Sequence, residues 1–170
     1  IPNPKWKKEN FSGDPWRIGD TYFTAIGQYG FQVTPMQMVR GMAAIANNGK
    51  LLNPVLVKTN DLPVFSKIDL DESYFKTVKE GLRQAVTAGL ATSLNIPQVE
   101  VAAKTGTAEL GILKNRINSW VVGFFPYKNP KYVFVVLMEN GPSNNFISSS
   151  FVMRELFDWM VINTPDYLKE

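Results

Sequence analysis

The sequence predicts an α/β fold of the α+β type, in which helices flank an antiparallel sheet. Two apolar segments, 119–125 and 132–138, are separated by a short turn with two prolines and an asparagine, 126–130. Strands joined by so short a turn pair in antiparallel fashion. Both segments are almost continuously apolar, which indicates that both faces of the sheet are covered. Segments with capping residues and helical spacing of apolar residues are expected to supply that cover.

The first 30 residues contain many Pro, Gly, Asn and aromatic residues and have no regular apolar period. We therefore expect loops held by aromatic rings, without a periodic element. The segment 27–30 is expected to form a tight turn. A phosphate-binding loop is the alternative for these glycines, but their spacing is wrong and no Lys-Ser/Thr pair follows them.

A first helix is expected to begin at Thr34. This residue can cap the helix, Pro35 suits its first position, and Gln37 can complete a capping box. The Asn-Asn-Gly string at 47–49 is expected to end it. The segment 51–58 is expected to be extended but to lie at a sheet edge or outside a sheet, because it contains a proline.

Two more helices are expected, one from an acidic cap at 69–72 to about Gly89, and one over 151–162 between serine caps and a Thr-Pro stop. The apolar residues at helical spacing are expected to face the core. In the earlier helix these are Phe75, Val78, Leu82, Ala85 and Val86, and in the later one Val152, Leu156, Trp159 and Met160. The segment 110–118 is expected to be a polar connection.

The segment 101–109 has the composition of a strand and also carries polar residues that could bind a ligand. Small and β-branched residues enter a core and are followed by Lys104, Thr105, Gly106 and Thr107. Side chains alternate in direction along a strand, and a glycine leaves the backbone open to close approach. An accessible backbone beside a cation and two hydroxyls suits an anionic, amide-containing ligand. A strand end that runs into a turn produces the same tripeptide, so the string alone does not decide the function.

The composition excludes several classes of protein. The 170 residues suffice for one modest domain with a core, and the net charge of +3 is small. The only cluster of lysines, Lys5, Lys7 and Lys8, is more typical of a solvated loop than of a nucleic-acid site. There is no histidine or cysteine, so the usual metal and haem ligand sets, histidine triads and cysteine nucleophiles are excluded. We expect no metal, no cofactor and no nucleic-acid partner.

Several motifs, in the right order, resemble the class B penicillin-binding proteins, most closely the penicillin-binding protein 2 type. The blocks are Pro4-Lys5-Trp6-Lys7, Trp16 with Gly19-Asp20-Thr21, Ile26-Gly27-Gln28, Val33-Thr34-Pro35-Met36-Gln37-Met38, Ala44-Ile45-Ala46-Asn47-Asn48-Gly49, Lys104-Thr105-Gly106-Thr107-Ala108-Glu109, and Trp120 with Gly123-Phe124-Phe125-Pro126. They match the C-terminal half of the transpeptidase domain. The resemblance implies part of a penicillin-binding transpeptidase fold, which serine β-lactamases share. The segment 28–30 departs from the family's usual Gln-Gly-aromatic order.

The resemblance also implies an activity, the crosslinking of peptidoglycan by acyl transfer from D-Ala-D-Ala stem peptides, with acylation by β-lactams. The family uses a Ser-x-x-Lys nucleophile, a Ser-x-Asn motif and Lys-Thr-Gly, in that order. By position, Lys104 would supply positive potential and bind the Ser-x-Asn serine. Thr105 and Thr107 would bind the ligand's carboxylate, Gly106 would leave room for the substrate backbone, and the Thr107 N–H would form half of an oxyanion hole.

The nucleophile is expected to be absent from this chain. Ser73-x-x-Lys76 and Ser143-Asn144-Asn145 resemble the missing motifs but stand in the wrong order, and Ser73 has a capping reason to exist. We therefore expect residues 1–170 to be the C-terminal part of a single transpeptidase domain. Alone, the chain should be inactive and should expose an apolar surface that the missing N-terminal half covers.

Three alternatives remain at this point: a non-catalytic penicillin sensor, a division-type class B protein, and a serine β-lactamase, whose fold suits the aromatic N-terminal segment poorly. No apolar run reaches the ~18 residues of a membrane span. By resemblance only, the parent protein is expected at the extracytoplasmic face of the bacterial inner membrane, anchored upstream. Membrane proteins of the elongation complex are its expected partners.

Overall fold

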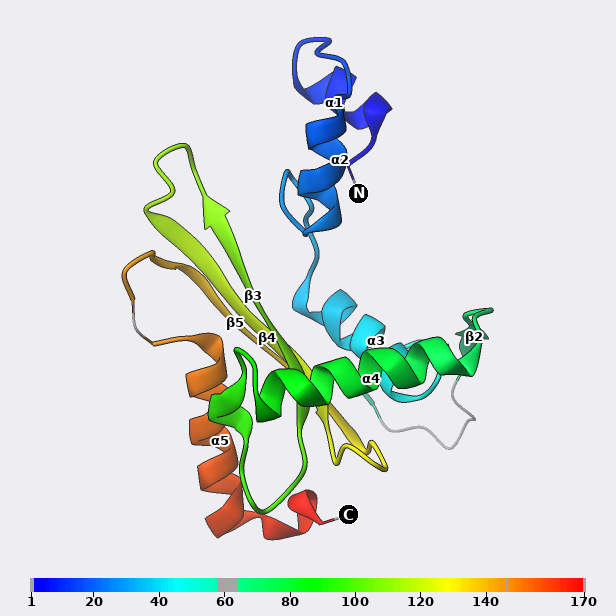
Figure 1. Cartoon of the computed structure of the whole chain (residues 1–170), viewed down its shortest axis with the longest axis vertical. Helices are drawn as coiled ribbons and strands as arrows, with labels where there is room; N and C mark the ends of the chain where they lie inside the picture. Colours follow the sequence, from blue (N-terminus) through cyan, green and yellow to red (C-terminus); the bar gives the residue numbers. More distant parts are fainter. Residues whose placement is uncertain (1, 58–63, 146, 170) are drawn as a thin grey trace.

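The computed structural model describes residues 2–57, 64–145 and 147–169. Five α-helices, two short 3₁₀ helices and five strands follow one another in these residues (Figure 1). The α-helices are α1 (Pro4–Asn10), α2 (Ile18–Ala25), α3 (Pro35–Ala46), α4 (Glu72–Thr87) and α5 (Ser149–Asn163). The strands are β1 (Lys50–Leu52), β2 (Phe65–Lys67), β3 (Ala102–Leu110), β4 (Arg116–Phe125) and β5 (Tyr132–Pro142), and the 3₁₀ helices are η1 (Thr92–Leu94) and η2 (Pro165–Leu168).

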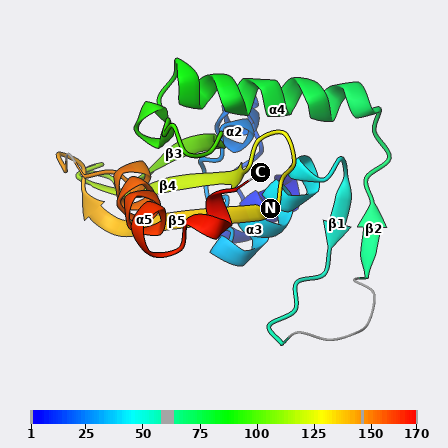
Figure 2. The same ribbon diagram turned by 90° about the horizontal axis from the view of Figure 1, so that it is seen from below.

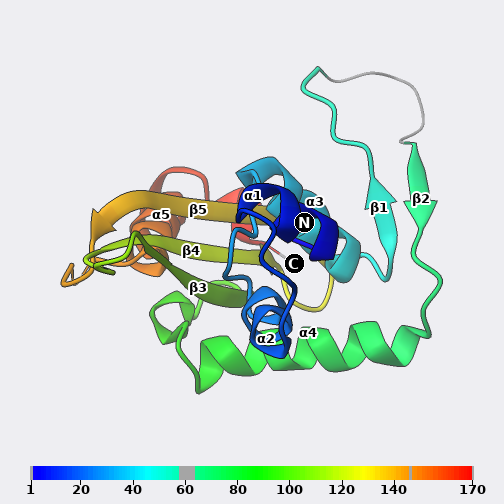
Figure 3. The same ribbon diagram turned by 90° about the horizontal axis from the view of Figure 1, so that it is seen from above.

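The predicted antiparallel sheet is confirmed. Its strand order is β3-β4-β5, and the turn at 126–130 joins β4 to β5 as the sequence predicts. β3 and β5 are therefore the two edges of this sheet within the described residues. The small β1-β2 ribbon projects away from it (Figures 2 and 3).

Both faces of the sheet are covered, also as predicted. On one face Val121 and Phe134 pack with Phe157 of α5. On the other face Val122 and Phe124 pack with Met42 of α3 and with α4. α4 also runs alongside β3, beyond the edge of the sheet (Figure 2). This cover fixes β3 between a buried neighbour strand and a helix.

Local capping signals place three helices where the sequence predicts them. The Thr34 side chain accepts from the Gln37 N–H and the Gln37 side chain accepts from the Thr34 N–H, which completes the capping box of α3. Asp71 caps α4, and Ser148 caps α5. α3 ends at Ala46 and α4 at Thr87, with Asn47 and Ala88 as the C-cap residues, close to the predicted stops.

The predicted buried face of the last helix is only partly right. Met160 is half-buried and packs against the core, as predicted, but Val152, Leu156 and Trp159 are exposed, whereas Met153 and Phe157 are buried. Apolar residues lie on both faces of α5, so spacing alone cannot select the buried face. The phenylalanines of β4 and β5, which contact Phe157 edge-on, select it.

The absence of helices in the first 30 residues is also a wrong prediction, because α1 and α2 form there. Asn3 caps α1 by accepting from the Trp6 N–H. The Arg17 N–H donates to the Asp20 side chain at the start of α2. Both helices are shorter than three turns, so their apolar period is too brief to detect. The expected turn at 27–30 is present, with left-handed backbone at Gly27, Tyr29 and Gly30.

Two boundaries differ from the sequence prediction. The polar connection expected at 110–118 is confined to 111–115, because β3 and β4 extend further along each other. The extended segment expected at 51–58 pairs with β2 only through β1 at its start, and position 58 lies outside the described residues. The proline at 54 ends the pairing, as expected for a residue without an N–H.

Candidate active site

The Lys-Thr-Gly-Thr string lies in the middle of β3, as the sequence predicts. Lys104, Gly106 and Thr107 are exposed and Thr105 is half-buried. The strand before them is fully buried, because Ala102 and Ala103 pack into the two cores on opposite faces. By strand alternation, the two threonines continue the face toward α5, and Lys104 continues the face toward α3.

The outer edge of β3 presents a row of backbone groups. The carbonyl of Val101 accepts from Arg83 at 2.9 Å, that of Thr105 from the Lys104 ammonium at 2.7 Å, and that of Thr107 from the Gln28 side chain at 3.3 Å. In an antiparallel ladder, alternate residues direct both N–H and C=O to the same edge. These three acceptors therefore belong to the set that points away from β4.

The backbone N–H and C=O groups of the even-numbered residues of β3 point toward β4. The carbonyl of Glu100 accepts from the Tyr127 N–H on the β4 side of the strand, at 2.8 Å. The N–H groups of Thr105 and Thr107 consequently lie along the outer edge, which no strand pairs with in the described residues. An extended ligand that lies along this edge meets N–H and C=O groups in alternation, as an added strand would.

Gly106 is exposed and has room for a Cβ. A Cβ built there would lie 3.6 Å from the Trp120 Cβ, which is an ordinary contact. The fold therefore does not require a glycine at this position. This observation agrees with the expectation that Gly106 keeps the strand accessible, without testing it.

The lysine expected to bind a serine of the Ser-x-Asn motif turns back onto its own strand, because its ammonium bonds to the carbonyl of Thr105. Ser143, the tempting serine of that motif, lies just after β5, where its N–H donates to the Asn115 carbonyl. The structure does not bring Ser143 into contact with Lys104.

Ser73 occupies the first turn of α4. Its N–H donates to Asp71 at 2.8 Å. Hydrogen bonding from the Ser73 hydroxyl, and then from its N–H, lowers the pKa of Asp71. Ser73 is therefore part of the cap of α4, through its N–H.

Two residues near the strand were missed by sequence reasoning. Ser119 is the register partner of Thr107 on β4, and its hydroxyl accepts from the Ser149 N–H at 3.1 Å. This bond fixes the start of α5 behind the threonines. Gln28 contacts Thr107 from 79 positions away in the sequence. The only sequence signal for Gln28 is its place in one of the blocks on which the resemblance rests.

A cluster of aromatic and charged side chains holds the turn that carries Gln28. This N-terminal cluster consists of Trp6, Lys7, Phe11, Asp14, Trp16, Arg17, Asp20 and Tyr29. The Tyr29 ring stacks on Phe11 and meets Trp6 and Trp16 edge-on, with centroids 5.8 to 6.1 Å apart. The ammonium of Lys7 lies over the same ring, 5.7 Å from its centroid.

Lys7 corrects the prediction of a solvated lysine loop, because its side chain is only 3% exposed. Its ammonium lies 2.6 Å from Asp20 and 2.9 Å from Asp14, and Arg17 binds Asp14 through two nitrogens at 2.6 Å. Burial acts to lower the pKa of Lys7, but its hydrogen bonds to Asp20 and Asp14 together raise it above the ordinary value. The hydrogen bond from Arg17, followed by that from Lys7, lowers the pKa of Asp14 to about 2. The hydrogen bond from Lys7 likewise lowers the pKa of Asp20.

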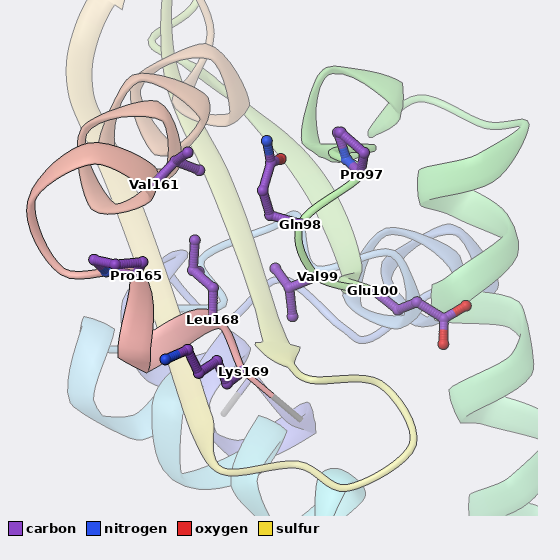
Figure 4. A pocket seen from close by; sticks show the side chains of 8 residues that line it. All are labelled: Pro97, Gln98, Val99, Glu100, Val161, Pro165, Leu168 and Lys169. Atoms are coloured by element: carbon purple, nitrogen blue, oxygen red, sulfur yellow. The ribbon is translucent and has the colours of Figure 1, made fainter.

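A pocket of about 450 Å³ opens elsewhere, between the segment before β3 and the C-terminal end of α5 (Figure 4). Its charged groups already have partners, because Glu100 pairs with Arg83 and Lys128, and Lys169 pairs with Asp166. None of the Lys-Thr-Gly residues lines it. The outer edge of β3 therefore remains the candidate site.

The described residues contain neither a metal-binding cluster nor a membrane-spanning helix. Among residues 2–57, 64–145 and 147–169, no three His, Cys, Asp or Glu side chains gather where they could hold a metal ion. In the same residues, none of the helices combines the length and the apolar character that crossing a bilayer requires.

Sequence comparison and structure comparison both find penicillin-binding proteins that are similar to this chain. Peptidoglycan D,D-transpeptidase MrdA of Haemophilus influenzae is 29% identical over 85% of this chain, and penicillin-binding protein H of Bacillus subtilis is 30% identical over 78%. The PBP2 chain in a complex with MreC from Helicobacter pylori has a TM-score of 0.75 and 28% identity over 94% of this chain. PBP2 of Pseudomonas aeruginosa in complex with WCK 5153 has a TM-score of 0.73 and 27% identity over 97%.

The match covers only part of each relative. The chain spans 26% of the H. influenzae protein and 22% of the B. subtilis protein, and 30% and 39% of the two structures. The Penicillin binding protein transpeptidase domain family matches residues 4–158, which is most of the chain. Together with the antiparallel sheet and its exposed Lys-Thr-Gly edge, this match shows that the chain belongs to the penicillin-binding protein transpeptidase domain family, and that it resembles the PBP2 members of class B.

Proposed function

We propose that this chain is the C-terminal part of the transpeptidase domain of a peptidoglycan D,D-transpeptidase that crosslinks stem peptides and is acylated by β-lactams. The observation that carries the proposal is the outer edge of β3, where Lys104, Gly106 and Thr107 are exposed on a strand that no other strand covers in the described part of the chain. The relatives' shared description as D,D-transpeptidases supports the same activity.

The chemistry proposed for this edge is stabilisation of charge. A serine contributed from outside this chain attacks the carbonyl carbon of the D-Ala-D-Ala bond, and the carbonyl oxygen becomes an oxyanion. The N–H of Thr107, on the open edge, is one of its donors, and losing such a donor costs about 3–4 kcal/mol of transition-state stabilisation.

The neighbouring side chains are proposed to bind the rest of the substrate. Lys104 supplies positive potential, and the hydroxyls of Thr105 and Thr107 bind the terminal carboxylate. Gly106 lets the substrate backbone approach, because it places no side chain on this exposed part of the strand. These roles are those of the family, carried over to the matching positions.

We further propose that the remainder of the domain covers two surfaces of this chain. β5 is an edge strand in the described residues although 132–138 is almost entirely apolar. Val152, Leu156 and Trp159 of α5 form an exposed apolar stripe. Uncovered edges and apolar patches of this kind mark sites where further chain packs.

The elongation-complex role is proposed by analogy. The solved complex of a PBP2 relative with MreC supports a membrane-associated partner of the cell-elongation machinery. The same family relationship supports a location at the extracytoplasmic face of the inner membrane.

Intact-mass measurement after incubation with benzylpenicillin tests the proposed function. We expect no adduct on this chain alone, and one penicilloyl adduct per molecule on a chain extended upstream to include a Ser-x-x-Lys motif. Circular dichroism of both samples controls for folding. An adduct on the chain alone would make one of its own serines the nucleophile, and an extended, folded domain without an adduct would contradict the enzyme proposal.

A further inference from the structure

We propose that Gln28 is a positioning residue of this site, which holds the backbone of Thr107 by binding its carbonyl through the side-chain amide. The inference rests on the proposed acyl-transfer function. The Gln28 Nε2 donates to the Thr107 carbonyl at 3.3 Å, and the side chain is half-buried. Gln28 lies outside the Ser-x-x-Lys, Ser-x-Asn and Lys-Thr-Gly motifs that the family uses for the reaction.

The contact is important because the carbonyl that Gln28 binds belongs to Thr107, the residue whose N–H is the proposed oxyanion donor. Thr107 directs its N–H and its C=O to the same outer edge of β3. Residues inside a sheet are held from both sides, but an edge residue lacks a second strand. The bond from Gln28 supplies a restraint on the open side, and by fixing the Thr107 carbonyl it limits rotation of the residue whose N–H faces the oxyanion.

Gln28 is carried on a rigid turn. Gly27, Tyr29 and Gly30 all have left-handed backbone, with φ between 60° and 76°. A Cβ on Gly30 would lie 2.7 Å from the Trp6 ring, so the ring and the turn are closely fitted. Tyr29 is held by three aromatic rings and by the Lys7 ammonium of the N-terminal cluster.

The amide of Gln28 therefore projects from a fixed platform. A long side chain on a mobile loop would lose much conformational entropy on binding a carbonyl, whereas one on a fixed turn loses less. A carbonyl oxygen has two lone pairs, so the Thr107 oxygen can accept from Gln28 and still accept from an N–H of a bound ligand.

The reaction with penicillin gives the inference a specific signature. In acylation the lactam carbonyl carbon gains a bond to the serine oxygen and loses its bond to the ring nitrogen, which takes up the serine proton. In deacylation a water oxygen replaces the serine oxygen at the same carbon, and a water proton returns to the serine oxygen. Both steps pass through an oxyanion, so a misplaced Thr107 N–H slows both, whereas weaker binding alone affects only acylation below saturation.

The experiment uses the complete transpeptidase domain and a fluorescent penicillin. Gln28→Met keeps the length of the side chain and removes the donor, and Gln84→Met, at an exposed position of α4, is the matched control. We expect Gln28→Met to lower the acylation rate constant at saturation and the deacylation rate constant by about 2- to 10-fold each, the range of one neutral hydrogen bond. The thermal unfolding midpoint of Gln28→Met should equal that of Gln84→Met.

A second variant adds a pH readout. Gln28→Glu also removes the donor, and at neutral pH its carboxylate repels the carbonyl oxygen. Protonation restores an O–H donor, so its deficit relative to wild type should shrink as the pH falls toward the ordinary carboxyl range of about 4.3. Gln28→Met should show no such recovery.

The outcomes separate the inference from the function on which it rests. If the wild-type domain is acylated and Gln28→Met matches Gln84→Met in both rate constants, the positioning role is wrong and the transpeptidase proposal stands. A variant that loses only thermal stability or only affinity also overturns it. A folded wild-type domain that is not acylated overturns both.

Discussion

Gly106 and Gly123 lie on neighbouring strands but lack a side chain for different reasons. A Cβ on Gly123 would lie 2.4 Å from the Ala102 carbonyl oxygen and 2.8 Å from the Ala103 Cβ, so the packing of β3 on β4 requires a glycine. At Gly106 the nearest atom would be 3.6 Å away. Gly106 leaves space on an exposed strand, and Gly123 allows the close packing of β3 on β4.

The two glycines therefore respond differently to the same substitution. Gly123→Ala should destabilise the domain by about 1–3 kcal/mol, the usual cost of overpacking. Gly106→Ala should leave stability within about 0.5 kcal/mol of wild type and slow acylation by penicillin, because the methyl group occupies the ligand's space. Urea unfolding and acylation rates of the complete domain measure the two effects, and a reversed pattern would contradict the assignment of Gly106 to the site.

Single residues also mark how far the sequence could predict the site. Lys104, Thr105, Gly106 and Thr107 are consecutive, so one strand prediction places all four. Gln28 reaches the same strand only through the tertiary fold, across 79 positions. No periodicity or local motif encodes that contact, and a solvated glutamine would look the same in sequence.

At the scale of secondary-structure elements, prediction succeeded where the deciding interactions are local. The capping box of α3 lies within four residues, and the hairpin of β4 and β5 is set by a five-residue turn. α1 and α2 were missed because distant groups stabilise them, above all the pairing of Lys7 with Asp20. The face of α5 was misassigned because the aromatic residues of the sheet, and not the helix, determine it.

The ion pairs that tie α1 to α2 should make this region sensitive to acid. The pKa of Asp14 is lowered from 3.8 to about 2, so its stabilising contribution is complete above pH 3.8 and is lost as the pH falls through about 2. The lowered pKa of Asp20 acts in the same direction. The pKa of Lys7 is raised from 10.5, so its contribution is complete below pH 10.5 and is lost only as the pH rises above that value.

Asp14→Asn tests this linkage. Thermal unfolding, followed by the near-ultraviolet signal of the tryptophans, should show that wild type loses stability between pH 3.8 and about 2 more steeply than the variant. Asp69→Asn removes an exposed carboxylate outside the N-terminal cluster and should follow wild type. Parallel losses for wild type and Asp14→Asn would show that the cluster does not set the acid response.

At the scale of the whole molecule, the described sheet has three strands and two edges that no further strand pairs with, and α5 exposes an apolar stripe. The sequence predicted the sheet and its helical cover, and both are confirmed. That these residues are the C-terminal part of a larger domain stays a prediction of the resemblance. The sequence could not predict which surfaces are exposed, because that depends on which face of α5 meets the sheet.

The chain alone should therefore associate with itself. Analytical ultracentrifugation should show an average mass that rises with concentration, and the double variant Leu156→Gln/Trp159→Gln should lower it. Ile112→Gln, at a fully exposed loop position between β3 and β4, removes an apolar group elsewhere and is the control. A wild-type chain that is monomeric and unfolds cooperatively would contradict this prediction.

Two side chains from other elements bind the outer edge of β3. Arg83 of α4 donates to the carbonyl of Val101, just before the strand, and Gln28 donates to that of Thr107, near its middle. Six residue steps, or ~20 Å at the rise of an extended strand, separate these two carbonyls. A long strand from another protein would need both carbonyls for continuous pairing along this edge. Arg83 and Gln28 therefore help to protect an exposed sheet edge from the unwanted pairing that leads to aggregation.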